Sequence, residues 1–248
     1  EFIGRFPTLV ALAKSSLADV IRIWASLGYN VRARRLHELA VEVVRDNAGV
    51  LPNDIEALRK LPGLGPYTAA ALASFAFYLP VPVIDTNIER VLNRVGLGPV
   101  AATKREIERL ATSWRPIRNA SSWHQGLMDI GAMVCKVRKP LCAQCPFNAY
   151  CKAAPYIHGE HPQVPPQDVR PTRKKQGTFK GSTRFYRGRI VESLRTIPRN
   201  SSIQSVTLAH KIFEHFSEEE HFRWFEELLG GLEKDGLIRL QSKRVRLP

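Results

Sequence analysis

The sequence predicts a mainly α-helical protein with a small winged-helix-like module at its C-terminus. Three observations support this fold class. Apolar residues recur at helical spacing through the first 154 residues, where convincing alternation of apolar and polar residues is absent. Glycine and proline follow these segments where helices are expected to end. Three further helical segments and two short apolar strands around a basic turn close the chain.

Each predicted element follows from its apolar spacing and its end signals. In the first 154 residues the predicted helices cover 17–28, 31–48, 52–60, 67–77, 86–95, 103–114 and 123–135. Asn53 is the predicted N-cap of the third helix, and Glu56 completes a spacing like that of a capping box. The predicted C-terminal elements are helices at 186–195, 205–216 and 218–234, followed by strands at 236–240 and 245–247.

A composition shift divides the chain into three parts. Residues 155–171 contain five prolines and are followed by an Arg-Lys-Lys run, which indicates a stiff basic linker. We therefore expect a helical domain over 1–154, a linker over 155–182 and the winged-helix-like module over 183–248.

Charge favours a polyanionic partner. The 248 residues carry a formal net charge of +14, and the sequence pI is about 10.0. Nucleic acid is the commonest partner of such a chain. No apolar run approaches the roughly 20 residues of a membrane helix, and no secretory signal pattern opens the chain. The sequence thus predicts a monomeric, cytoplasmic, nucleoid-associated protein without membrane contact.

All four cysteines lie within 17 residues, at Cys135, Cys142, Cys145 and Cys151. Their spacing is C-x6-C-x2-C-x5-C. Two disulfides, a zinc site and a [4Fe–4S] cluster are the three interpretations. The single C-x2-C pair and the uneven gaps favour the cluster, since zinc sites usually pair two C-x2-4-C knuckles. Nearby basic residues offset the thiolate charge and are candidates for phosphate contact, in particular Lys136 and Arg138.

A glycine-rich turn separates the third and fourth predicted helices. It carries Leu61, Gly63, Leu64 and Gly65. Two glycines let backbone amides point outward beside a helix N-terminus, which makes a site for one DNA phosphate without reading sequence. A plain corner between two helices is the alternative.

An aspartate follows this turn by twenty residues. Apolar residues lead directly into Asp85 at the start of a predicted helix. An ordinary N-cap is one interpretation of Asp85. However, the succession of glycine hairpin, small helix, Asp85 and four cysteines resembles the helix-hairpin-helix base-excision glycosylases that carry a [4Fe–4S] cluster. The resemblance implies that Asp85 lies beside the sugar of a flipped nucleotide.

The position two residues after Gly65 distinguishes the branches of that family. In the glycosylase-lyases similar to endonuclease III it is a lysine that forms a Schiff base. Here it is Tyr67, which matches the monofunctional branches. Arg-Phe-Pro-Thr at residues 5–8, Gly28-Tyr29 with the basic run at 32–37, and residues 125–132 resemble the A/G-specific adenine DNA glycosylases.

The resemblance implies excision of adenine from A:8-oxoguanine or A:G mispairs in duplex DNA. Asp85 stabilises the sugar cation, Tyr67 and Asn87 assist it, Gln125 and Tyr29 recognise bases, and Arg34 contacts DNA. Packing, capping or solvent-facing roles are the alternatives for these side chains. At the level of function, a thymine–guanine mismatch glycosylase and a non-catalytic iron–sulfur DNA-binding module stay open.

The chain departs from the family pattern at three places. The family's second catalytic carboxylate, a Glu, lies upstream of the Arg-Phe-Pro-Thr segment, and this chain starts only four residues before Arg5. We therefore expect an N-terminally truncated enzyme that binds lesion DNA and releases adenine poorly. Asn30 stands where the family usually has Tyr, and His124 where it usually has Asn.

Overall fold

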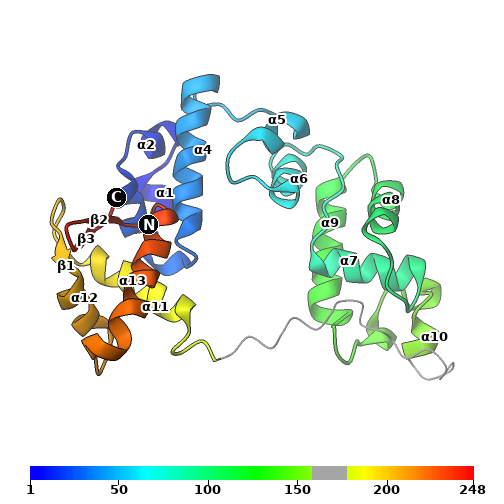
Figure 1. The fold of residues 1–248 in the computed structure, drawn as a ribbon. Coiled ribbons are helices and arrows are strands. Elements are labelled where there is room, and N and C mark those ends of the chain that lie inside the picture. The colour runs from blue at the N-terminus through cyan, green and yellow to red at the C-terminus, as the bar shows by residue number, and fades with distance from the viewer. Residues whose placement is uncertain (158–177) are drawn as a thin grey trace. The chain divides into compact units, whose positions relative to one another are not determined.

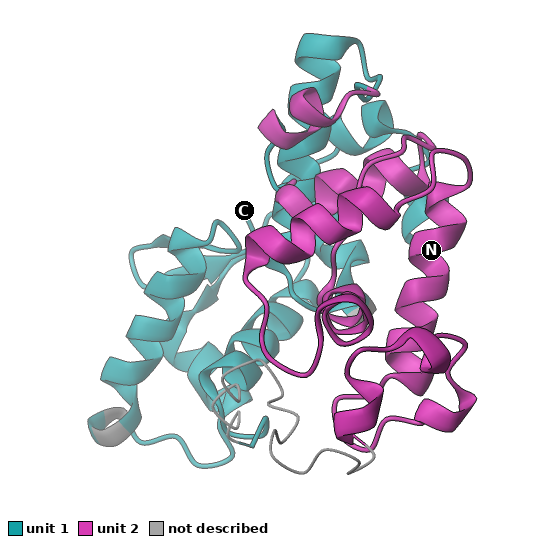
Figure 2. Ribbon diagram, turned by 90° about the vertical axis from the view of Figure 1, so that its right-hand side faces the viewer, with its two compact units in different colours: residues 1–52, 61–63, 176–248 teal, residues 53–60, 64–175 magenta. Residues whose placement is uncertain are grey.

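The structure is a computed structural model that describes residues 1–157 and 178–248, and it is mainly helical (Figure 1). Two units interleave along the chain (Figure 2). Unit 1 contains residues 1–52, 61–63 and 176–248, whereas unit 2 contains residues 53–60 and 64–175. Within the described residues, no helix is long and apolar enough to cross a membrane.

Unit 1 combines helices from both ends of the chain. Its N-terminal elements are α1 (Phe2–Arg5), α2 (Leu9–Ala13), α3 (Leu17–Ile23), the 3-10 turn η1 (Ala25–Leu27) and α4 (Val31–Asn47). Its C-terminal elements are α11 (Thr183–Arg195), β1 (Ile203–Gln204), α12 (Ser205–Ile212), α13 (Glu218–Lys234), β2 (Arg239–Gln241) and β3 (Arg244–Arg246). The helices α1 and α2 and the strand β1 are not among the elements predicted from the sequence.

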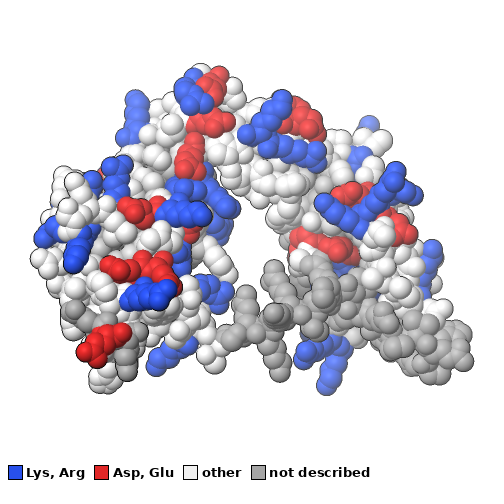
Figure 3. All heavy atoms as spheres, viewed as in Figure 1, with Lys and Arg blue, Asp and Glu red and all other residues white. Residues whose placement is uncertain are grey.

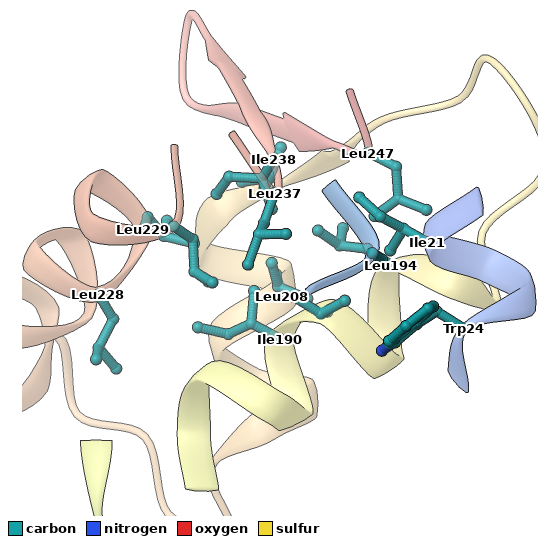
Figure 4. Close-up of a cluster of buried hydrophobic side chains, with 14 of the residues drawn as sticks. Ile21, Trp24, Ile190, Leu194, Leu208, Leu228, Leu229, Leu237, Ile238 and Leu247 are labelled. Carbon is teal, nitrogen blue, oxygen red and sulfur yellow. The ribbon is translucent and has the colours of Figure 1, made fainter. Parts of the chain in front are cut away.

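One hydrophobic core joins these two groups of elements. Ile21 and Trp24 from the N-terminal helices lie in the same cluster as Ile190, Leu194 and Leu208 (Figure 4). Fully burying each aliphatic side chain of this size contributes about 1.5–3 kcal/mol. The predicted boundaries at 154 and 183 remain a prediction, but residues 183–248 share their core with the first 52 residues.

The three strands form one antiparallel sheet in the order β1-β3-β2. Val245 at its centre is fully buried and pairs with both Ile203 and Leu240. The succession α11, β1, α12, α13, β2, β3 is that of a winged helix. The first predicted strand is shorter than expected, since β2 begins only at Arg239, after the buried Leu237 and Ile238, and the second is shifted by one residue to Arg244–Arg246.

Polar contacts also connect α11 with the N-terminal helices. Arg195 at the end of α11 donates to the backbone carbonyl of Ile21 (2.9 Å) and to Oδ1 of Asn30 (2.7 Å). Arg22 donates in return to the carbonyl of Arg195. Asn30, a departure from the family pattern, therefore has a defined partner in the C-terminal module.

Within its described residues, unit 2 contains helices and helical turns joined by irregular segments, and no strand. Its elements are α5 (Ile55–Lys60), α6 (Pro66–Phe75), α7 (Thr86–Leu92), the π-turn η2 (Asn93–Leu97), α8 (Lys104–Trp114), α9 (Ala120–Asp129), the π-turn η3 (Ile130–Val134), the 3-10 turns η4 (Cys142–Gln144) and η5 (Asn148–Tyr150), and α10 (Ala154–Ile157). The predicted helices 86–95 and 123–135 thus each end in a π-turn. The predicted linker 155–182 lies largely outside the described residues.

Capping explains where two of these helices begin. Thr103 and Glu106 form a complete capping box at the start of α8. At α5 the prediction of Asn53 as N-cap is wrong. The carboxylate of Asp54 accepts the backbone N–H groups of Glu56 (3.1 Å) and Ala57 (2.9 Å) instead. A charged carboxylate at this position is also favoured by the helix dipole.

Candidate active site and cysteine cavity

The glycine hairpin connects α5 to α6. Gly63 adopts a φ of +78°, and a Cβ there would lie 2.9 Å from the Cβ of Arg35. Gly65 is the N-cap of α6 and has open space where a Cβ would be. No side chain caps α6, so its first N–H groups lack an intrahelical partner and are available to an anion. Leu61 is buried, and Leu64 is half-buried.

Asp85 lies at the start of α7 and is half-buried. Its Oδ1 accepts the backbone N–H groups of Asn87 (2.9 Å) and Ile88 (2.7 Å), while Oδ2 accepts the side-chain amide of Asn87 (3.1 Å). Asp85 is therefore the N-cap of α7, and this role does not exclude a second one. Capping uses Oδ1, so Oδ2 keeps a lone pair for a second partner.

Tyr67 in the first turn of α6 lies within electrostatic range of Asp85. Partial burial, together with the negative charge of Asp85, raises the pKa of the Tyr67 hydroxyl. The Tyr67 side chain is nevertheless 47% exposed. It therefore keeps its proton at neutral pH and is accessible from solvent.

His124 on α9 holds the segment that leads into Asp85. The backbone N–H of Val83 donates to Nε2 of His124 (3.3 Å), so the neutral ring carries its proton on Nδ1, which lies 3.2 Å from Oγ of Ser74. Burial, and then the charge of Arg115, lower the pKa of His124 to about 4. The imidazole is thus a neutral bridge between α6, the Val83 segment and α9.

Asn87 is held between Asp85 and η3. A Cβ at Gly131 would lie 2.6 Å from the Cβ of Asn87, so only glycine allows η3 to approach this closely. Arg90 fixes the contact, because it donates to Oδ1 of Asn87 (2.8 Å) and to the carbonyl oxygens of Gly131 and Cys135. The orientation of Asn87 toward Asp85 therefore depends on the cysteine loop.

The predicted base-recognition residues lie in different units. Gln125 is exposed on α9 in unit 2, and its amide donates to Asp129 (3.1 Å). Tyr29 belongs to unit 1, has a φ of +47° and is 70% exposed. Arg34, also in unit 1, lies against Gly236 and forms an ion pair with Glu38 at 3.5 Å. The structure thus groups Tyr67, Asp85 and Asn87 as one site, and their roles remain predictions.

The four cysteines line one cavity of about 20 Å³ together with apolar side chains such as Val91 and Val134. Burial and the neighbouring cysteines raise the pKa of the Cys142 thiol, and burial raises that of Cys151. Among the described residues, no three His, Cys, Asp or Glu side chains are arranged to hold a metal ion.

A buried arginine faces the cavity. Arg94 is only 7% exposed, and its Nη1 lies 3.6 Å from Sγ of Cys135. The same guanidinium donates to the carbonyls of Lys136 (2.8 Å) and Val137 (3.2 Å). Lys136 and Arg138 themselves are exposed. A buried cation beside four thiols indicates that this cavity accommodates negative charge.

The roles of Arg90 in holding Asn87 and of Arg94 in facing the cysteine cavity are not predicted from the sequence. A signal was present, since the two arginines are four residues apart in a segment where Val91, Leu92 and Val95 occupy the buried positions. A charged residue within an apolar helical stripe indicates a buried partner, here the carbonyl groups and thiols of the cysteine loop.

Helices that meet at a glycine hairpin, followed by a capped aspartate, define a class of helical nucleic-acid-binding fold. A family model described as HhH-GPD superfamily base excision DNA repair protein matches residues 1–116. The chain belongs to this superfamily. The predicted family resemblance and the predicted mainly helical, helix-hairpin-helix fold class are therefore confirmed.

Curated relatives extend the similarity. Over 199 residues the chain is 40% identical to adenine DNA glycosylase of Mycobacterium tuberculosis, and the match covers 79% of this chain and 62% of that protein. It is also 40% identical over 161 residues to human adenine DNA glycosylase, with 63% of this chain and 30% of that protein covered. The chain thus spans less than two thirds of these relatives.

Solved structures share the fold. A thermostable thymine-DNA glycosylase matches with a TM-score of 0.58 and 30% identity, covering 62% of this chain and 72% of that one. A non-covalent endonuclease III–DNA complex matches with a TM-score of 0.54 and 28% identity, covering 61% and 72%.

Proposed function

We propose that the protein is a monofunctional DNA N-glycosylase that removes adenine paired with 8-oxoguanine or guanine. The observation that carries the proposal is the site in which Asn87 holds Asp85 and Tyr67 lies within electrostatic range, because it supplies a carboxylate without a nucleophilic amine. The similarity to adenine DNA glycosylases supports the choice of base. Lys and Arg side chains occur over both units on the face drawn in Figure 3, and the net charge of +14 fits a DNA partner.

The reaction begins with extrusion of the target nucleotide from the duplex, which costs a few kcal/mol. The α6 N-terminus and the hairpin amides bind a DNA phosphate and hold the strand in register. As the glycosidic bond breaks, positive charge develops on the sugar. Oδ2 of Asp85 stabilises that charge, as carboxylates do in glycosidases.

Asn87 and Tyr67 assist this step in different ways. Asn87 fixes the Asp85 carboxylate through Nδ2, and Arg90 in turn fixes Asn87. The protonated Tyr67 hydroxyl positions the sugar or an attacking water by hydrogen bonding. The family resemblance assigns protonation of the leaving base to a Glu that precedes Arg5. General acid catalysis of this kind is worth about 10²–10⁴-fold.

We also propose that the four cysteines hold a [4Fe–4S] cluster. Thiolates around one zinc ion converge on a single point at about 2.3 Å. In contrast, each thiolate of a cluster binds its own iron, so a cavity separates the four sulfurs. The apolar lining and the buried Arg94 fit this negatively charged group. When bound, the cluster supplies a rigid crosslink of the loop that carries Lys136 and Arg138, and no redox step is needed.

Single-turnover base release tests the proposed substrate, in a version of the protein extended at its N-terminus by the Glu-containing segment that the family resemblance places before Arg5. Duplexes that contain A:8-oxoguanine, A:G and T:G are compared at saturating protein. We expect adenine release from the first two and none from T:G, without strand cleavage by β-elimination because Tyr67 has no amine. Release of thymine alone would assign the protein to the thymine mismatch branch. Binding without any release would leave a DNA-binding module.

Metal analysis of anaerobically purified protein tests the cluster. We expect about four iron and four sulfide per chain and a brown colour from thiolate-to-iron charge transfer. Cys145→Ser removes one ligand and is expected to abolish the colour. Stoichiometric zinc in a colourless protein would contradict the proposal.

A further inference from the structure

The C-terminal module separates its charges, although residues 191–248 together carry a formal net charge of zero. Residues 236–248 contain four Arg or Lys and no Asp or Glu, whereas residues 214–235 contain eight Asp or Glu and two Arg or Lys. The first stretch forms the β2–β3 hairpin, and the second contains α13. One side of the module is thus cationic, and the helix beside it is acidic.

Strand register places the cations on one face of the sheet. Leu240 and Val245 alternate with exposed or half-buried polar residues, and Val245 is fully buried against the core. Arg239 lies directly opposite Arg246, and Gln241 lies opposite Arg244. The outer face of the sheet is therefore basic and polar throughout β2 and β3.

This arrangement is unfavourable in the free protein. Like charges directly opposite each other in a sheet are destabilising. No carboxylate from the described part of the chain forms an ion pair with Arg239, Lys243 or Arg246. Such a pair of arginines is stabilised when an anion lies against both.

The hairpin is held in place before any ligand arrives. Arg244 donates to Oγ of Ser202 (2.7 Å) and to its carbonyl oxygen (2.8 Å), which connects β3 to β1. The backbone N–H of Leu240 donates to Glu233 (2.8 Å). Both turn residues, Ser242 and Lys243, have positive φ, the geometry of a tight hairpin turn. The basic face is thus a fixed surface rather than a flexible tail.

We propose that this outer sheet face, with Arg239 and Arg246, together with Lys243 in the hairpin turn, binds the phosphate backbone of duplex DNA. It is a second DNA contact, separate from the glycine hairpin, and it rests on the proposed function only in the choice of DNA as the polyanion. The acidic α13 is repelled by phosphate, so the sheet and not that helix meets the duplex. The contact is electrostatic and independent of base sequence.

A charge-neutralised protein tests the contact. In the hairpin variant, Arg239→Gln and Arg246→Gln remove two cations from the sheet face, and Lys243→Gln removes one from the hairpin turn. The matched control removes three cations from α12 and α13 of the same module, through Lys211→Gln, Arg223→Gln and Lys234→Gln. Affinity for an undamaged duplex is measured from about 50 to 200 mM salt, and thermal unfolding checks that both variants fold.

We expect the hairpin variant to bind at least tenfold more weakly at the lowest salt. Its log–log salt slope falls by about 2–3, since each phosphate contact contributes about 0.9. The control keeps the wild-type slope to within about one. The hairpin variant unfolds at the wild-type temperature or above it, because the like-charged pair is gone. The rate of base release at saturating protein is unchanged, since the face does not touch the reacting sugar.

The outcomes separate this inference from the proposed function. Equal slopes for the hairpin and control variants would overturn the inference while leaving the glycosylase proposal intact. A slope change confined to the hairpin variant, in a protein that releases no base, would support the inference and contradict the glycosylase proposal. A wild-type protein that does not bind duplex DNA would overturn both.

Discussion

The two units differ in what they bury. The core of unit 1 is a continuous apolar cluster, and among the described residues its one buried polar side chain is Ser205. Unit 2 has a smaller apolar cluster and buries four polar side chains, at Ser74, Asn93, Arg94 and His124. Hydrophobic burial is insensitive to pH and ligands, whereas buried polar groups depend on their partners. Unit 1 is therefore expected to be the stable scaffold, whereas the stability of unit 2 is expected to depend on the partners and the protonation of its buried polar groups.

The largest expected effect is the loss of unit 2 when a cysteine ligand is removed. If the cysteines hold the proposed cluster, Cys142→Ala removes one of its ligands and leaves the buried Arg94 guanidinium without the negative charge beside it. We expect the amide hydrogens of α7, η2 and η3 to exchange fast, while those of α11 and α13 stay protected. Hydrogen exchange followed by mass spectrometry distinguishes the units in the intact chain. Equal deprotection of both units would contradict the comparison.

Truncation of a core side chain in unit 1 is expected to lower the stability of the protein without affecting the polar network of unit 2. Leu208 is fully buried between elements from both ends of the chain. Leu208→Ala is expected to cost about 2–5 kcal/mol, measured by denaturant unfolding, with the iron content and the pH dependence unchanged. A loss below about 1 kcal/mol would show that the C-terminal module does not share a core with the N-terminal helices.

The pH dependence of stability tests His124. Its pKa is lowered to about 4 in the folded protein, whereas the ordinary value is 6.5. The unfolded chain therefore takes up a proton at a pH where the folded chain does not. The stabilisation is complete above pH 6.5 and is lost progressively as the pH falls from 6.5 toward 4, by at most about 3 kcal/mol.

His124→Asn isolates this contribution, because Asn has hydrogen-bonding groups and does not titrate. We expect its unfolding free energy to change less between pH 7 and pH 5 than that of the wild type. A variant with an unchanged pH profile would show that another group controls the acid sensitivity of unit 2. Leu208→Ala should keep the wild-type profile, which links the effect to the polar network.

Gly131 tests the connection between the cysteine loop and Asp85. An added Cβ would lie 2.6 Å from Asn87, so Gly131→Ala is expected to cost about 1–3 kcal/mol through overpacking. It also displaces Asn87 from Oδ2 of Asp85, and the rate of base release should fall with little change in DNA affinity. Gly126→Ala is the control, since a Cβ there has open space.

The smallest effect on stability is expected at Gly65 in the glycine hairpin. Gly65→Ala meets no neighbouring atom and keeps an ordinary backbone, so its cost stays below about 1 kcal/mol. Gly63→Ala combines a φ of +78° with a close contact to Arg35 and costs about 1–2 kcal/mol or more. Weaker binding of all duplexes by Gly65→Ala supports a phosphate site. Unchanged binding would make the hairpin a structural corner.

Local signals made much of the fold predictable. The periods of α3, α4 and α8 and the capping residues around Thr103 lie within one helix each, so the sequence shows them directly. Short elements such as α1 and β1 carry too few residues for a period. The sharing of one core by residues 1–52 and 176–248 depends on long-range packing, for which a single sequence has no local signal.

The candidate site likewise contains residues that local sequence signals reveal and residues that they do not. Asp85 and the four cysteines were found because a motif with fixed spacing contains them. The partners that orient them were not, since Arg94 and His124 gain their importance from burial. The residue types do not distinguish Asn53 from Asp54 as a cap, because both favour that position, and only the backbone geometry decides between them.

Two capping aspartates allow the most direct test of the central claim, that Asp85 acts on the sugar as well as on its helix. Asp54 and Asp85 each accept two backbone N–H groups at a helix start. Asp54 is exposed, however, and no side-chain amide of the described residues donates to its carboxylate. Asparagine caps helices about as well as aspartate does. The measurement is single-turnover adenine release from an A:8-oxoguanine duplex. It compares the Asp85→Asn and Asp54→Asn variants of the protein extended at its N-terminus by the Glu-containing segment. The account predicts a loss of at least about 10²-fold for Asp85→Asn alone, with DNA binding retained by both variants. Equal, near wild-type release by the two proteins would show that Asp85 is only a helix cap.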